Sequence, residues 1–263
     1  MPRAMPFLHR CLGNPFLSFL ARIWFSAPIK DVYCGLRGFS RSFYESLQMQ
    51  CTGMEFAVEM IIKASLMKAK VAEVPITLFP DGRIQQRSHL RTFRDGWRTL
   101  RFFLLYSPRW LFLVPGGFML AVGLLAFVIL LPGTFFVGRV GLDIHTLLFA
   151  SFAVIVGYDA IGLAWLTRVF AASQKLLPPK EFVSRLDEKL TLETGLLFAG
   201  ALLTSGLIIA VYAVCRWGAS DFGPLNSQMF VRLVVSSTTL LLLGSHTALG
   251  MFLWSILKLP IRA

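Results

Sequence analysis

The residues best suited to chemistry lie between Asp31 and Arg101, the one long charge-dense part of the chain. Asp31 and Glu55 are carboxylates that can take up a proton, and arginines surround them. A guanidinium presents a planar fork of donors that matches phosphate oxygens. Because this cationic stretch leads into membrane-length segments, it indicates chemistry on an anionic lipid head group.

Two short motifs could position these groups. Gly35 and Gly38 flank Arg37 in an irregular passage, where glycine lets the backbone approach a ligand and Arg37 can bind an anion. A tight turn with a surface arginine explains the same pattern. Thr52 and Glu55 have the spacing of a capping box, so a helix is predicted from about residue 53 to 68. Glu55 is therefore either a catalytic carboxylate or only a helix cap.

A strand and a basic helix are predicted next. Residues 71–78 alternate in polarity, and Pro75 favours an edge strand or a strand end. Arginines then recur at helical spacing and form one cationic stripe, made of Arg87, Arg91, Arg94, Arg98 and Arg101. An interfacial helix held by anionic lipid and a phosphate-binding site both account for this stripe.

Composition identifies a membrane protein. The chain has 263 residues, of which 56% are hydrophobic and 15% charged, too apolar for an ordinary soluble domain. Residues 1–109 carry sixteen lysines and arginines against seven acids, and so hold most of the net charge of +12. No zinc-finger or RNP-type pattern accompanies this charge, so nucleic acid is not an expected partner. The four cysteines lack metal-site spacing and predict neither a metal site nor a disulfide framework.

Four membrane-length segments follow the basic stretch, at about residues 110–131, 147–170, 192–214 and 230–257. Residues 5–27 are too interrupted to cross and predict an amphipathic interfacial segment. Lysines and arginines gather in the loop between the second and third spans. Positive-inside counting therefore places the N-terminal part and the C-terminus in the cytoplasm, with the chain in the inner membrane.

Polar residues within the spans offer a second hypothesis. Asp159 and His246 are ionisable, and such groups in a membrane are functional candidates. They suggest either a hydrogen bond between two helices or a proton or ion pathway in a small transporter or flippase. Glycines in the spans predict close helix packing at Gly116, Gly117, Gly123, Gly157, Gly162, Gly195, Gly200 and Gly206.

Several ordered motifs carry a resemblance to a known family. They are Asp31-x-x-Cys34-Gly35-Leu36-Arg37-Gly38-Phe39, Gly53-Met54-Glu55-Phe56-Ala57-x-Glu59-Met60, Glu73-Val74-Pro75-Ile76, Arg83 with Ser88-His89-Leu90-Arg91, and Arg94-Asp95-Gly96-Trp97-Arg98. Together they resemble the C-terminal part of family 2 glycosyltransferases, and more narrowly the polyprenyl-phosphate enzymes related to dolichol-phosphate mannose synthase and dolichol-phosphate glucose synthetase. The resemblance covers nearly the whole chain.

The resemblance implies an activity and its cofactor. Such enzymes use a GT-A α/β domain to transfer a sugar, with inversion, from a nucleotide sugar to a polyprenyl phosphate such as undecaprenyl or dolichyl phosphate. They hold Mg²⁺ or Mn²⁺ through an Asp-x-Asp motif. This sequence has no Asp-x-Asp, so no ligand site for the metal is recognised in it. We therefore expect an N-terminally truncated enzyme that lacks the donor-binding half.

The resemblance also implies the fold class and the roles of individual residues. We expect a mostly α membrane protein with three parts: a truncated GT-A remnant at 1–91, a basic interfacial helix at 92–109 and a bundle of four transmembrane helices at 110–257. Glu55, with Asp31 as second candidate, would be the catalytic carboxylate. The predicted phosphate-binding groups are Arg37, Arg83, Ser88, Arg91, Arg94 and Arg98. A catalytically inactive membrane anchor or lipid-binding fragment is the alternative, and a homo-oligomer is compatible with either.

Overall fold

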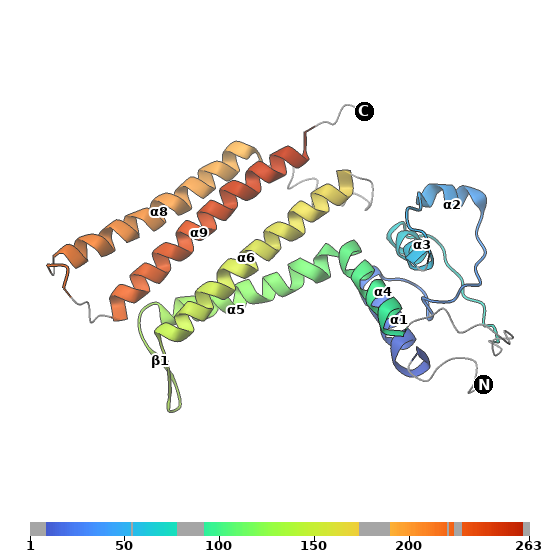
Figure 1. Ribbon diagram of the computed structural model, residues 1–263, viewed down its shortest axis with the longest axis horizontal. Coiled ribbons are helices and arrows are strands. Elements are labelled where there is room, and N and C mark those ends of the chain that lie inside the picture. The colour runs from blue at the N-terminus through green and yellow to red at the C-terminus, as the bar shows by residue number, and fades with distance from the viewer. Residues whose placement is uncertain are drawn as a thin grey trace. The chain divides into compact units, whose positions relative to one another are not determined.

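The computed structural model describes residues 9–53, 55–77, 92–173, 190–219, 221–223 and 228–259. The chain divides into two compact units, Met1–Ser107 and Pro108–Ala263. The regular structure of the described residues is almost entirely helical, as the sequence predicted (Figure 1).

The first unit is built from short helices. In the described residues these are a π-helical turn at His9–Gly13, then α1 (Asn14–Phe25), α2 (Arg41–Leu47), α3 (Glu55–Leu66) and α4 (Thr92–Tyr106). Pro15 in the first turn of α1 fits the fixed φ of a helix start. The side chain of Ser40 caps α2 by accepting the amide of Phe43 at 3.3 Å.

The core of this unit lies where α1, α3 and α4 meet. Buried apolar side chains come from all three helices and from the segment after α1, and they include Leu17, Ala21, Phe25, Val32, Val58, Ile62, Phe102 and Phe103. The rings of Phe25 and Phe103 pack edge to face with their centroids 5.5 Å apart. The helix that carries the basic stripe is thus held to α1 and α3 by its apolar face.

The outer faces of α1 and α4 carry exposed apolar side chains. Exposed side chains on α1 recur every three or four residues at Phe16, Phe19 and Ile23, and α4 exposes Phe93 and Trp97. Each helix thus packs one apolar face on the protein and exposes further apolar side chains on the opposite face. This is typical of helices that lie in a membrane interface, the location that the sequence predicted for both segments.

One local prediction for the first unit is wrong. Residues 71–77 form no strand, since no other strand of the described part of this unit is there to exchange backbone hydrogen bonds. Instead, the backbone amide of Lys30 donates to the carboxylate of Glu73 at 2.6 Å. The helix predicted at about residues 53–68 is confirmed as α3, and it starts at Glu55 because Gly53 has a left-handed φ of 76°, which no helical residue adopts.

The second unit contains four helices long and apolar enough to cross a membrane among its described residues. A π-helical turn at Arg109–Leu113 leads into α5 (Val114–Leu130), and α6 (Ile144–Ser173), α8 (Leu192–Gly218) and α9 (Gln228–Leu257) follow. The four predicted spans are therefore confirmed. A short hairpin of β1 (Phe135–Val137) and β2 (Val140–Leu142) joins α5 to α6, which the sequence analysis missed.

These helices pack in the order α5, α6, α9, α8 (Figure 1). Glycines make the contacts close: a β-carbon on Gly157 of α6 would lie 2.5 Å from the backbone nitrogen of Leu120 on α5. The packing role is confirmed for Gly116, Gly123, Gly157, Gly195 and Gly206. It is wrong for Gly117, Gly162 and Gly200, which have open space beside them. Gly244, which contacts α8 in the same way, was not predicted.

Polar pairs tie α6 to α9. The hydroxyls of Ser151 and Thr239 lie 2.6 Å apart, and Asp159 Oδ1 lies 2.8 Å from His246 Nδ1. The helix-to-helix reading of Asp159 and His246 is thus confirmed. A buried pair went unrecognised in the sequence: Arg232 binds the Asp143 carboxylate and donates its Nε–H to the carbonyl of Leu130 at 3.2 Å.

Candidate functional site

Glu55 and Arg98 form an ion pair within the first unit. Glu55 is the first residue of α3, and its Oε1 lies 3.2 Å from Nε of Arg98 on α4. The side chains are 21% and 45% exposed, so an anion in solution can reach the guanidinium. The capping-box prediction is wrong, since the described residues Thr52 and Glu55 share no hydrogen bond. The carboxylate instead holds an arginine.

The segment from Asp31 to Arg37 is fixed to both helices. Tyr33 donates its hydroxyl to Thr99 Oγ1 at 2.7 Å, which ties the segment to α4 beside Arg98. Asp31 accepts the backbone amide of Tyr33 at 2.8 Å and so closes a local turn. Burial raises the pKa of the Tyr33 hydroxyl, so this phenol stays protonated at neutral pH.

Arg37 fastens the segment to α3. Its Nε and Nη2 donate to the carbonyls of Cys34 and Val32 at 2.8 and 2.9 Å, and Nη1 donates to the carbonyl of Ala57. Burial lowers the pKa of Arg37, and the nearby Cys34 and Asp31 oppose that shift. With three of five N–H groups on backbone carbonyls, Arg37 has only two left for an anion.

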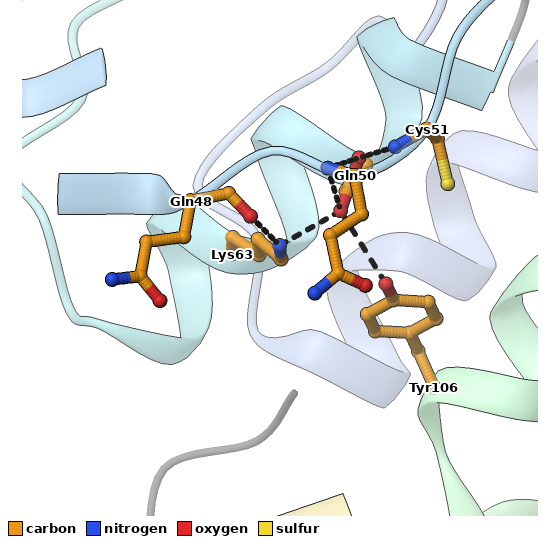
Figure 2. A network of polar contacts seen from close by, with 6 residues as sticks. Gln48, Gln50, Cys51, Lys63 and Tyr106 are labelled. Carbon is orange, nitrogen blue, oxygen red and sulfur yellow. Dashed lines mark hydrogen bonds and ion pairs between the residues drawn. The ribbon is translucent and has the colours of Figure 1, made fainter. Parts of the chain in front are cut away.

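A buried network of hydrogen bonds around Glu59 fixes the position of α3. Glu59 is fully buried, and its carboxylate accepts the backbone amides of Gln50 and Cys51 at 3.1 and 2.8 Å. Lys63 lies 2.8 Å from the same carboxylate and donates to the carbonyl of Gln48 at 2.7 Å. Tyr106 of α4 donates its hydroxyl to Glu59 at 3.4 Å. Figure 2 shows Lys63, Tyr106 and the 48–51 segment converging on this point.

The ionisation of the network follows from these contacts. Burial pushes the pKa of Glu59 upward, but the hydrogen bonds from Lys63, Cys51 and Gln50 outweigh it, so the pKa is lowered overall. Burial, together with the charge of Glu59, raises the pKa of the Cys51 thiol to about 11 and also raises that of the Tyr106 phenol. At neutral pH the network therefore holds a carboxylate with a neutral thiol and a neutral phenol, and Cys51 is not a nucleophile.

We expect the stability of the first unit to fall in acid because of Glu59. A folded-state pKa below the unfolded value of about 4.3 contributes stability above that pH, and the contribution is lost as the pH falls through the folded pKa. Chemical unfolding of the full chain between pH 7 and pH 3 measures this slope. Glu59→Gln should flatten the curve in the acidic range, and an unchanged slope would contradict the assignment.

The structure brings together part of the predicted site. Glu55 pairs with Arg98, and Asp31 and Arg37 share the segment between α1 and α2, which hydrogen bonds fix to α3 and α4. Arg94 is exposed one turn before Arg98 on α4. Arg83, Ser88 and Arg91 lie outside the described residues. Their role stays a prediction.

Glu59 was named from the sequence only as part of a family motif, and Lys63 and Tyr106 were not predicted. Glu59 and Lys63 are four residues apart, a spacing that indicates an ion pair. Nothing in that spacing indicates burial, since such pairs are usually solvated.

The residues of this site do not fit a divalent metal. In the described part of the chain, no three His, Cys, Asp or Glu side chains lie close enough together to hold a metal ion. Mg²⁺ and Mn²⁺ take several oxygen ligands, mainly carboxylates. The carboxylates near this site are committed to arginine, lysine and backbone amides.

Part of the membrane unit is similar to a known family. Residues 165–258 match the family described as the glycosyltransferase family 2 C-terminal transmembrane region. The chain is also 31% identical over 254 residues to the low-salt glycan biosynthesis hexosyltransferase Agl6 of Haloferax volcanii. That match covers 96% of this chain and 59% of the relative, so the chain spans about three-fifths of the relative's length. No solved structure matches the chain.

The match to Agl6 extends over both units. Since 96% of the chain is aligned, the similarity includes most of the first unit, where Glu55, Arg98 and Glu59 lie, as well as the spans. The similarity to Agl6 supports the resemblance to family 2 glycosyltransferases that the motifs of residues 31–98 predicted, and the chain is an integral membrane protein.

Proposed function

We propose that this chain supplies the acceptor-binding and membrane part of a hexosyltransferase that moves a sugar from a nucleotide sugar to a polyprenyl phosphate. The single observation that carries the proposal is the similarity to a hexosyltransferase across both units. The exposed cationic face of α4 supports the acceptor assignment, because a lipid phosphate presents its charge at the depth of an interfacial helix.

In this proposal Arg98 binds the acceptor phosphate. Its guanidinium is 45% exposed and already paired with a carboxylate, so it is oriented before a ligand arrives. A phosphate can replace Glu55 as its partner, because both anions accept the same fork of donors. Replacing one anionic partner by another costs less free energy than ordering an arginine side chain that has no partner.

Glu55 then acts on the acceptor side of the transfer. A lipid phosphate is already ionised at neutral pH, so its oxygen can attack the sugar carbon without a strong base. Glu55, released from Arg98, would face the incoming sugar and orient its hydroxyls. Inversion requires the attacking oxygen in line with the leaving nucleotide, which is a matter of positioning. Asp31, Arg37 and Arg94 are proposed to line the same site.

The donor part is proposed from the family alone. A nucleotide sugar is the expected donor, and a divalent cation would neutralise its diphosphate. The described residues provide no ligands for that cation. We place the first unit and the C-terminus on the cytoplasmic side of the inner membrane, where the basic residues favour that orientation.

We expect Arg98→Ala to weaken binding of polyprenyl phosphate by tenfold or more, because a charge-assisted hydrogen bond contributes about 1.5–3 kcal/mol. The full chain in lipid nanodiscs would be titrated with radiolabelled undecaprenyl phosphate. Arg41→Ala is the matched control, since Arg41 is also paired with a glutamate but is 92% exposed. Equal affinity in the two variants would overturn the role of Arg98.

The same membranes also allow sugar transfer to be tested. The full chain would be incubated with undecaprenyl phosphate, Mg²⁺ and labelled UDP-glucose or GDP-mannose, alongside Glu55→Gln. Transfer that is lost in Glu55→Gln but kept in Arg41→Ala supports a complete transferase. Specific acceptor binding without transfer supports the acceptor-side assignment. Absence of both contradicts the proposal and favours a catalytically inactive anchor.

A further inference from the structure

The last turns of α6 and α9 hold an aromatic and basic cluster that the transferase site does not use. Trp165 of α6 stacks on Trp254 of α9 with the ring centroids 5.5 Å apart and an interplanar angle of 25°. The ammonium of Lys258 lies 4.1 Å from the centroid of the Trp254 ring. Buried Val169 and Met251 pack beneath this pair. The cluster is therefore a packed feature of the helix interface and not a loose group of surface residues.

Two donors in this cluster lack an acceptor. The indole N–H of Trp165 is buried and has no hydrogen-bond partner in the described residues. Arg168 follows three residues later on the same face of α6, is half-buried, and makes no hydrogen bond or ion pair with any described residue. Leaving a buried donor without a hydrogen-bond partner is unfavourable, and more so for a charged group away from water. An acceptor that satisfies both donors is best an anion, because Arg168 carries a positive charge.

The surroundings indicate which acceptor is available. The membrane-length segments end at Ala172 and Leu257, so Arg168 and Lys258 lie at the depth of the lipid head groups. The turns of α6 and α9 that form the cluster contain no acid, and Glu193 in the first turn of α8 is exposed. An aromatic belt with snorkelling cations explains Lys258 and Trp254, but it leaves the buried N–H of Trp165 without a partner.

We infer that Trp165, Arg168 and Lys258 form a binding site for the phosphate group of one membrane lipid between the ends of α6 and α9. The two cations neutralise the phosphate, and the indole N–H gives it a directed hydrogen bond. This inference does not depend on the transferase activity, because the residues belong to the membrane unit and differ from those of the Glu55 and Arg98 site.

Native mass spectrometry of the full chain, purified in detergent, can test this site. The chain would be titrated separately with phosphatidylglycerol, undecaprenyl phosphate and uncharged diacylglycerol. Trp165→Phe keeps the stacked ring and removes only the N–H, while Arg168→Gln removes the charge. Arg216→Gln, an exposed arginine at the end of α8, is the matched control for general charge. A normal melting temperature of each variant would show that it is folded.

We expect the chain to retain one phosphate lipid more tightly than diacylglycerol. Arg168→Gln should weaken that retention about tenfold and Trp165→Phe about threefold, with Arg216→Gln unchanged. Equal retention of both phosphate lipids identifies the phosphate itself as the ligand, and preference for one identifies the source. Similar losses in Arg168→Gln and Arg216→Gln, or none in Arg168→Gln and Trp165→Phe, would overturn the site. Arg98→Ala should leave it intact, which separates it from the proposed function.

Discussion

Replacing Glu59 by alanine should destabilise the first unit by about 3–5 kcal/mol, the cost of breaking a buried, hydrogen-bonded ion pair. The carboxylate is fully buried and satisfies two backbone amides, the Lys63 ammonium and the Tyr106 hydroxyl. Its removal leaves Lys63 as an uncompensated buried charge and leaves the amides of Gln50 and Cys51 without an acceptor. Since domains are stable by only about 5–15 kcal/mol, this loss is a large part of the total.

The measurement is urea unfolding of the full chain in detergent, with proteolysis of the first unit as the readout. Glu45→Ala is the matched control, because Glu45 is also paired with a basic residue but is 61% exposed. Exposed pairs contribute about 0–1 kcal/mol, so this variant should unfold close to the wild type. If Glu59→Ala and Glu45→Ala unfold at the same urea concentration, Glu59 does not stabilise the unit.

The double variant Glu59→Leu with Lys63→Met separates the contribution of the ion pair from that of the amide contacts. It removes both charges together and fills their volume with apolar groups, so no lone charge stays buried. It should be more stable than Glu59→Ala, although the amides of Gln50 and Cys51 stay unsatisfied. Stability no better than that of Glu59→Ala would show that the amide contacts, and not the ion pair, provide most of the effect.

Adding one methyl group at Gly157 should separate α5 from α6 and destabilise the membrane unit by about 3 kcal/mol, the upper range for overpacking. A β-carbon there would lie 2.5 Å from the Leu120 backbone nitrogen and 2.7 Å from the Gly116 carbonyl oxygen. Both neighbours are backbone atoms, which cannot turn aside as a side chain can. The helices must therefore move apart and lose their contacts along the whole interface.

Gly162→Ala on the same helix controls for this change, since a β-carbon at Gly162 meets nothing within 4 Å. Thermal unfolding of the purified chain in one detergent compares the two variants directly. Gly157→Ala should lower the melting temperature by several degrees, and Gly162→Ala should leave it unchanged or slightly raised. Similar melting temperatures for the two would mean that α5 and α6 do not depend on close backbone contact.

The sequence alone determined the membrane spans and the resemblance to a family. A run of about 20 apolar residues is a local property, so the four spans could be read without knowing their neighbours. Their ends were less certain: α6 starts at Ile144 rather than near residue 147, because the hairpin before it was not recognised. The motifs that resemble family 2 glycosyltransferases are equally local, and both the family matched by residues 165–258 and the similarity to Agl6 agree with that resemblance.

The tertiary structure alone decided how the charged residues are used. Glu55 and Arg98 are 43 residues apart in the chain, and only the packing of α3 on α4 makes them partners. Glu59 was only one member of a sequence motif, yet it is fully buried, and the 48–51 segment and Tyr106 donate hydrogen bonds to its carboxylate. A sequence pattern records which groups can be charged. Their burial depends on chain segments that are distant in sequence, and burial decides whether a charge stabilises the fold or stays available to bind a ligand.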